Sequence, residues 1–140
     1  FALLHQHFRQ LSERIGAQGG AVVKILGDGV LACFPDPVSA ARAGLELRGG
    51  AVGETEAALP VKVGVHCGTA MAVTLNDRLD YFGQTVRVVS RLASVARAGE
   101  LVLSEAVARD PGVASLLGER IRSAELVEGP GGVFAQRLPA

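Results

Sequence analysis

The sequence predicts an α+β domain in which helices pack on an antiparallel or mixed sheet. Two observations lead to this fold class: apolar residues recur at helical spacing in several segments, and runs rich in β-branched residues alternate with those segments along the chain. Strand pairs interleaved with helices are typical of a layered α+β architecture. The 140 residues are expected to form a single domain, 1–140, because this length supports one sizeable core.

The composition argues against several classes of protein. Lys plus Arg and Asp plus Glu number 14 each, so no net charge draws the chain to nucleic acid or to a membrane surface. The longest stretch without a charged residue, Val63 to Asn76, is too short and too broken to span a bilayer. No secretory leader is recognised. Cys33 and Cys67 have no second cysteine pair and no histidine cluster nearby, which favours buried free thiols over a disulfide or a zinc site, and a cytoplasmic location. Because the chain opens at Phe1 within a helical pattern, we expect it to be a fragment of a longer protein.

The chain begins with an amphipathic helix and a β-hairpin. Apolar residues at helical spacing predict a helix over 1–17, and Gly19-Gly20 end it. Two β-branched runs within 22–34 then flank Gly27-Asp28-Gly29, which predicts a tight turn. The turn would hold the Asp28 carboxylate at the tip of two stiff strands.

Lys24 is unusual because it lies inside an apolar strand. Strand alternation predicts that Lys24 shares a face with Val22 and Leu26. Two interpretations stay open at this point. Either the strand is an edge strand whose lysine reaches water while Asp28 is an ordinary turn acid, or both charged residues serve a function.

The remaining elements follow from the same patterns. His66 falls on the less apolar face of its strand, where a structurally satisfied histidine is favoured over a ligand or a base. We predict a helix over 37–48 capped by Asp36, a loop over 49–59, a second hairpin from strands 61–67 and 71–75, a polar loop over 76–83, a helix over 84–96, a strand over 101–103, a brief helix capped by Ser104, and a closing hairpin over 121–138 turned by 129–132.

The helix over 84–96 carries a stripe of positive charge. Arg87, Arg91 and Ser94 fall at i, i+4 and i+7 and share one face. The residues that can face the core are Val86, Val89, Leu92 or Ala93, and Ala96. No acidic residue between 81 and 97 neutralises the arginines. The stripe is either a solvated or internally paired face, or a site for phosphate, to which guanidinium groups are well suited.

Four motifs taken together resemble the catalytic domain of the class III adenylate/guanylate cyclases. They are Lys24-Ile25-Leu26-Gly27-Asp28-Gly29, Val63-Gly64-Val65-His66-Cys67-Gly68, Asp80-Tyr81-Phe82-Gly83-Gln84-Thr85-Val86 and Ser90-Arg91-Leu92, in order and at similar spacing over residues 1–107. The resemblance implies a ferredoxin-like α/β sandwich, a head-to-tail homodimer with active sites at the interface, and conversion of ATP or GTP into the 3′,5′-cyclic nucleotide and pyrophosphate. It also implies two divalent ions per site, Mg²⁺ or Mn²⁺.

The resemblance assigns expected roles to individual residues. Asp28 matches the second metal-binding aspartate, and Arg91 matches the arginine that stabilises the transition state at the phosphates. Lys24 resembles the residue that reads the purine edge, with Asp80 as its partner. A lysine with an aspartate selects adenine, whereas guanylate cyclases place a glutamate and a cysteine there, so ATP is the expected substrate. Lys24 and Asp28 would serve different sites of the dimer.

Two departures from the family pattern leave two functions open. The first metal-binding aspartate and its strand precede the opening helix and have no counterpart here, and Arg87 stands where a ribose-orienting asparagine is usual. Arginine offers donors but no acceptor. The chain is therefore expected to be an adenylate cyclase domain to which Arg87 contributes, or a catalytically impaired homology domain that senses nucleotide or dimerises. Diguanylate cyclases and P-loop nucleotidases are disfavoured, because their Gly-rich motifs are absent from the sequence.

Overall fold

The computed structural model describes residues 2–26, 29–48, 61–121, 124–128 and 134–138. The elements are α1 (Ala2–Ala17), β1 (Ala21–Leu26), β2 (Gly29–Cys33), α2 (Pro37–Leu47), β3 (Val63–Val65), β4 (Met71–Leu75), β5 (Arg78–Phe82), α3 (Gln84–Val95), β6 (Leu101–Ser104), α4 (Glu105–Ala108), α5 (Pro111–Leu117), η1 (Gly118–Ile121), β7 (Glu125–Glu128) and β8 (Phe134–Leu138). None of the helices in these ranges is long and apolar enough to cross a membrane. The predicted α+β class is confirmed.

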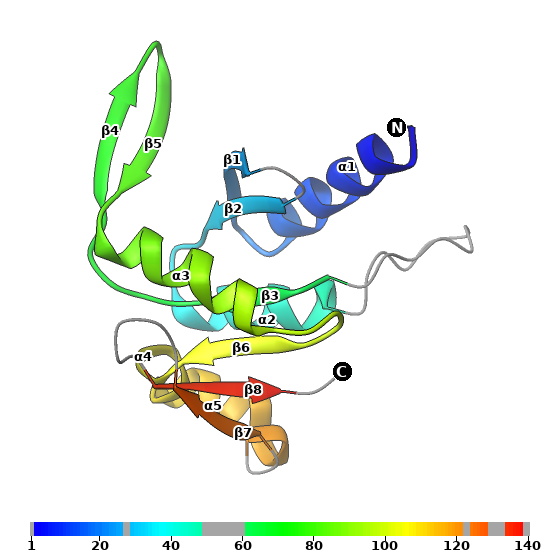
Figure 1. Ribbon diagram of the computed structural model, residues 1–140, viewed down its shortest axis with the longest axis vertical. Helices are drawn as coiled ribbons and strands as arrows, with labels where there is room; N and C mark the ends of the chain where they lie inside the picture. Colours follow the sequence, from blue (N-terminus) through cyan, green and yellow to red (C-terminus); the bar gives the residue numbers. More distant parts are fainter. Residues whose placement is uncertain (1, 27–28, 49–60, 122–123, 129–133, 139–140) are drawn as a thin grey trace.

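The centre of the fold is a mixed sheet with the strand order β3-β6-β8-β7 (Figure 1). β3 runs parallel to β6, and the other pairs are antiparallel. β6 is buried on both faces: Leu101 and Leu103 pack with residues of α2 and α5, whereas Val102 packs with α3. Helices on both faces of one sheet make a sandwich.

A glycine in β3 lets α3 approach the sheet closely. A Cβ atom on Gly64 would lie 2.6 Å from the backbone nitrogen of Ala93, so only glycine permits this packing. α3 then buries Val88 and Leu92 against the sheet. The predicted core face of this helix is confirmed at Leu92 and Ala96, which are buried, whereas Val86 and Val89 are only partly buried.

The hairpin β1–β2 packs on α1 through one face. Val22 and Ala32 contact the apolar cluster that α1 and α2 share. Val22 lies opposite Ala32 and Lys24 lies opposite Leu31, which leaves Val23 as an extra residue, a β-bulge. Since Leu31 and Ala32 point to opposite faces, Lys24 points away from Val22. The prediction that these two residues share a face was therefore wrong, because the bulge shifts the alternation.

The second predicted hairpin was also wrong. β3 belongs to the central sheet, where its valines pack in the core, and β4 pairs instead with β5. Asn76 and Asp77 form the turn, with φ angles of 51° and 62°. Two successive left-handed residues are typical of a two-residue hairpin turn, and Asn and Asp tolerate this conformation. The predicted polar loop over 76–83 is thus mostly the strand β5, and the hairpin extends from the body of the molecule (Figure 1).

Most other predicted elements are confirmed. Asp36 caps α2, since its Oδ1 accepts the N–H of Ser39 at 2.8 Å. Ser104 stands at the start of α4, but its side chain makes no capping hydrogen bond. β7 and β8 form the closing hairpin. Cys33 and Cys67 are free thiols, half-buried rather than fully buried. The predicted loop over 49–59 and the turn over 129–132 lie outside the described residues.

Candidate functional site

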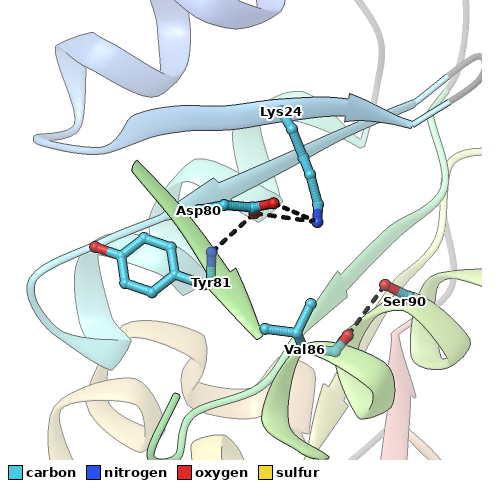
Figure 2. Close-up of polar contacts among 5 residues, drawn as sticks. All are labelled: Lys24, Asp80, Tyr81, Val86 and Ser90. Carbon is cyan, nitrogen blue, oxygen red and sulfur yellow. Dashed lines mark hydrogen bonds and ion pairs between the residues drawn. The ribbon is translucent and has the colours of Figure 1, made fainter. Parts of the chain in front are cut away.

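Lys24 and Asp80, which are far apart in the sequence, form an ion pair between β1 and β5 (Figure 2). Lys24 Nζ lies 3.1 Å from Oδ1 and donates a hydrogen bond of 3.3 Å to Oδ2 of Asp80. The bulge at Val23 makes this contact possible, because it turns the lysine from the α1 face of the hairpin toward β5. The structure thus brings the predicted pair together, while its role in reading a purine stays a prediction.

The carboxylate of Asp80 is fixed from two sides. The backbone N–H of Tyr81 donates to Oδ1 of Asp80 at 2.8 Å, beside the bond from Lys24 (Figure 2). The hydrogen bond from Lys24, together with that of Tyr81, holds the pKa of Asp80 below its ordinary value. Asp80 is therefore an ionised acceptor at neutral pH, next to an ammonium donor.

A cleft of about 460 Å³ opens beside the ion pair, between β1 residues 22–25 and β5 residues 78–80. Small-molecule sites commonly occupy ~300–1,000 Å³ and combine apolar walls with a few polar groups. Here the walls include Val23 and Leu79, and the side chains of Lys24 and Asp80 are 32% and 25% exposed. The pair is thus held by the protein and still accessible to a ligand.

α3 presents the predicted arginines to solvent. Arg87 and Arg91 are both exposed, and Nη2 of Arg87 donates to Oε1 of Gln84 at 3.0 Å. Within the described ranges no acidic side chain pairs with Arg87 or Arg91. On this helix the hydroxyl of Ser90 bonds only the backbone oxygen of Val86, at 3.0 Å (Figure 2). In the described structure no acidic side chain therefore neutralises the arginine face of α3. An anion site requires such an uncompensated positive charge.

The predicted metal ligand cannot be placed. Asp28 lies outside the described residues. In the part of the chain that the structure does describe, no group of three or more His, Cys, Asp or Glu side chains is arranged to hold a metal ion. The assignment of Asp28 to a metal site stays a prediction.

Sequence reasoning missed Tyr81 and Phe82 as neighbours of the pair. The Phe82 ring centroid lies 5.3 Å from Lys24 Nζ. The Tyr81 hydroxyl lies near the thiol of Cys33, and this contact raises the pKa of Tyr81. The turn at Asn76-Asp77 was the signal that could have revealed them, because it makes 78–82 a strand in which Asp80 and Phe82 share a face.

His66 has a structural partner, as predicted. Its Nδ1 lies 2.7 Å from Oγ of Ser104, which is fully buried. Burial lowers the pKa of His66, so the imidazole is favoured in its neutral form. This contact joins the carboxyl ends of β3 and β6 and does not involve the cleft.

Comparison with known proteins identifies the family of the chain. The adenylate and guanylate cyclase catalytic domain family matches residues 1–111. The uncharacterized protein Rv2212 of Mycobacterium tuberculosis is 34% identical over 108 residues, which cover 77% of this chain but only 27% of that protein. The chain therefore spans about a quarter of this relative's length.

Solved structures establish the shared fold. A monomeric adenylate cyclase from Trypanosoma brucei superposes with a TM-score of 0.72 at 15% identity, covering 98% of this chain and 78% of that one. A non-canonical dimeric guanylyl cyclase domain of a RhoGC fusion protein from Blastocladiella emersonii gives 0.62 at 18% identity, covering 98% and 81%. The fold, the order of the motifs and the family match agree, and the chain belongs to the class III adenylate/guanylate cyclase catalytic domain family.

Proposed function

We propose that this chain is an adenylate cyclase domain that converts ATP into 3′,5′-cyclic AMP and pyrophosphate, in the cytoplasm and as one domain of a longer protein. The observation that carries the proposal is the Lys24–Asp80 ion pair at the edge of the cleft. Adenine presents a ring nitrogen acceptor beside an amino donor. An ammonium and an ionised carboxylate side by side offer the matching donor and acceptor.

Arg91 would act at the phosphates. The reaction needs in-line attack of the ribose 3′-hydroxyl on the α-phosphate, while negative charge builds on the departing pyrophosphate. An exposed guanidinium without an acidic partner in the described structure is free to bind the charged phosphate oxygens through bidentate hydrogen bonds. Two divalent ions, Mg²⁺ or Mn²⁺, would supply Lewis-acid stabilisation, with Asp28 as their expected ligand.

A head-to-tail homodimer belongs to the same proposal. The hairpin β4–β5 leaves large apolar side chains in solvent, Met71 at 66%, Leu75 at 54% and Leu79 at 52%. Exposed apolar patches commonly mark protein interaction sites. The Blastocladiella domain, which shares the fold, is dimeric. In such a dimer Lys24 and Asp28 of one chain would serve different active sites.

A double substitution of the pair tests the choice of nucleotide. We expect Lys24→Glu combined with Asp80→Cys to shift the relative affinity from ATP toward GTP, because the donor and acceptor at the purine edge change. Dissociation constants for both nucleotides in the full protein measure this shift. Lys62→Glu makes the same charge change as the Lys24→Glu component, at an exposed lysine outside the cleft, and serves as the control for that component. Unchanged relative affinities in the double variant would sink the assignment of the pair.

Arg87 favours a second candidate function, a nucleotide-sensing or dimerisation module. Its exposed guanidinium stands where the family usually has an asparagine, and it cannot accept a hydrogen bond from ribose. Titration with a non-hydrolysable ATP analogue, with and without Mn²⁺, followed by a product assay, separates the two functions. Cyclic AMP formation supports the cyclase, whereas binding without product supports the module.

A further inference from the structure

The aromatic ring of Phe82 lies beside the ammonium group of the ion pair. Lys24 Nζ is 5.3 Å from the ring centroid, a distance at which the negative face of an aromatic ring attracts a cation. Phe82 is two residues beyond Asp80 on β5, and alternate residues of a strand point to the same side. Lys24 therefore meets a carboxylate and an aromatic ring presented by one strand.

This arrangement restricts an otherwise flexible side chain. A lysine ammonium is a point charge on a long stem with three N–H donors, and an accessible ion pair alone holds it weakly. Here both oxygens of Asp80 lie within 3.3 Å of Nζ. Nζ donates one hydrogen bond, to Oδ2 of Asp80, so a further N–H is available to a ligand in the cleft.

Phe82 has no evident role in the core. Its side chain is 42% exposed, and its cross-strand neighbour Met71 is 66% exposed. Neither residue belongs to any of the buried apolar clusters of the described structure. The phenyl group can therefore be replaced without removing core packing.

We propose that Phe82 is a positioning residue that holds the Lys24 ammonium in place and thereby sharpens the discrimination between purines. The proposal rests on the proposed function of Lys24 and Asp80. Adenine offers its acceptor at N1, whereas hypoxanthine carries a proton at N1 and offers its acceptor at O6. An ammonium held in position can donate to N1 of adenine but not to O6 of hypoxanthine. A mobile ammonium can reach either acceptor.

The test compares ATP with inosine triphosphate, which has the same ribose and triphosphate. Dissociation constants are measured for the full protein and for Phe82→Leu, Phe82→Tyr and Thr74→Ala. We expect Phe82→Leu to reduce the preference for ATP by about 2- to 5-fold, the scale of an exposed cation–π contact. Phe82→Tyr keeps an aromatic face and should restore the preference. Thr74→Ala changes an exposed side chain of the same hairpin that has no assigned role, and it should leave the preference unchanged.

A spectroscopic measurement tests the contact independently of any nucleotide. The ring current of Phe82 should move the ε-methylene proton signal of Lys24 upfield in the wild type and in Phe82→Tyr, but not in Phe82→Leu. Lys24→Met assigns the signal, and Lys62 provides an exposed lysine as reference.

The two measurements separate the possible failures. An unchanged preference in Phe82→Leu, in a protein that does prefer ATP, would overturn the positioning role. An identical Lys24 signal in the wild type and Phe82→Leu would overturn the contact itself. If the wild type bound both nucleotides equally, purine reading by the pair would fail, and the sharpening assigned to Phe82 would fail with it, whatever the lysine signal showed.

Discussion

The central sheet with its helices differs from the region formed by β1–β2 and β4–β5 in how its apolar surface is covered. In the central sheet, Leu101, Leu103 and Leu138 are at most 1% exposed. In the two hairpins, Ile25 is 61% and Met71 is 66% exposed. The central sheet covers its apolar surface with its own helices. The other region leaves apolar and charged groups available to a ligand or to a second copy of the chain.

The difference begins in the sequence of the strands. β6 is a run of buried residues, and a strand covered by helices on both faces needs no polar alternation. β5 contains the charged residues Arg78 and Asp80, and β4 and β5 are exposed at most positions and form a two-stranded sheet of their own. An isolated two-stranded hairpin is marginally stable in water. The site of proposed function thus lies in the region with the least packing of its own.

Matched truncations should give the largest difference between the two regions. Leu103→Ala removes a fully buried side chain and should lower the free energy of unfolding by about 2–5 kcal/mol. Leu75→Ala removes the same atoms from a side chain that is 54% exposed and should change it by less than ~0.5 kcal/mol. Urea unfolding of both variants measures this. Similar losses in both would show that Leu75 is covered in solution, and their dependence on protein concentration would assign that cover to a second copy of the chain.

The two regions also contain ion pairs of different kinds. Arg137 and Glu100, in the central sheet, have side chains only 16% and 11% exposed, with Nε 3.8 Å from Oε2. Arg137→Met would leave Glu100 buried with the backbone N–H of Arg97 still bound to it. We expect the free energy of unfolding to fall by about 3 kcal/mol, the lower end of the range for breaking a buried ion pair.

Lys24→Met is the matched change in the open region, which is the region formed by β1–β2 and β4–β5. This pair is accessible, so the same substitution should cost at most ~1 kcal/mol of unfolding free energy. ATP affinity should fall instead, because the donor to the base is lost. Parallel unfolding and nucleotide titrations compare the two variants. Loss of stability without loss of affinity in Lys24→Met would show that the pair is structural.

The sequence revealed the regularly patterned elements better than it revealed their partners. The helices over 1–17, 37–48 and 84–96 were predictable, because long amphipathic repeats and caps are local signals. The parallel pairing of β3 with β6 was not, since it joins strands separated by a hairpin and a helix. The turn at Asn76-Asp77 was read as part of a loop, although both residue types favour left-handed turns.

The site was predictable only in part. Lys24 and Asp80 were paired through resemblance to a family, whereas strand alternation alone placed Lys24 on the wrong face. The bulge at Val23 that corrects this has no signature in a run of β-branched residues. Phe82 was missed because a residue in a supposed loop has no defined face.

The smallest expected effects are two pH dependences, one for each region. In the central region, burial lowers the pKa of His66 below about 6.5, so the unfolded chain binds a proton before the folded one. Stability should therefore fall as the pH drops from about 6.5 through the folded pKa. His66→Asn keeps a polar group near Ser104 and should remove this slope. A slope that persists in His66→Asn would assign the titration to another group.

In the open region, the hydrogen bond from Lys24 lowers the pKa of Asp80 below about 3.8. The pair then stabilises the fold fully above that value and loses its effect as the pH falls through the lowered pKa. Asp36, which caps α2, titrates in the same range, so the difference between the wild type and Asp80→Asn is the quantity to follow. Unfolding midpoints in urea should show this difference constant near neutral pH and shrinking only below about pH 4. A difference that already shrinks near pH 6 would show that Lys24 does not hold the pKa of Asp80 below its ordinary value.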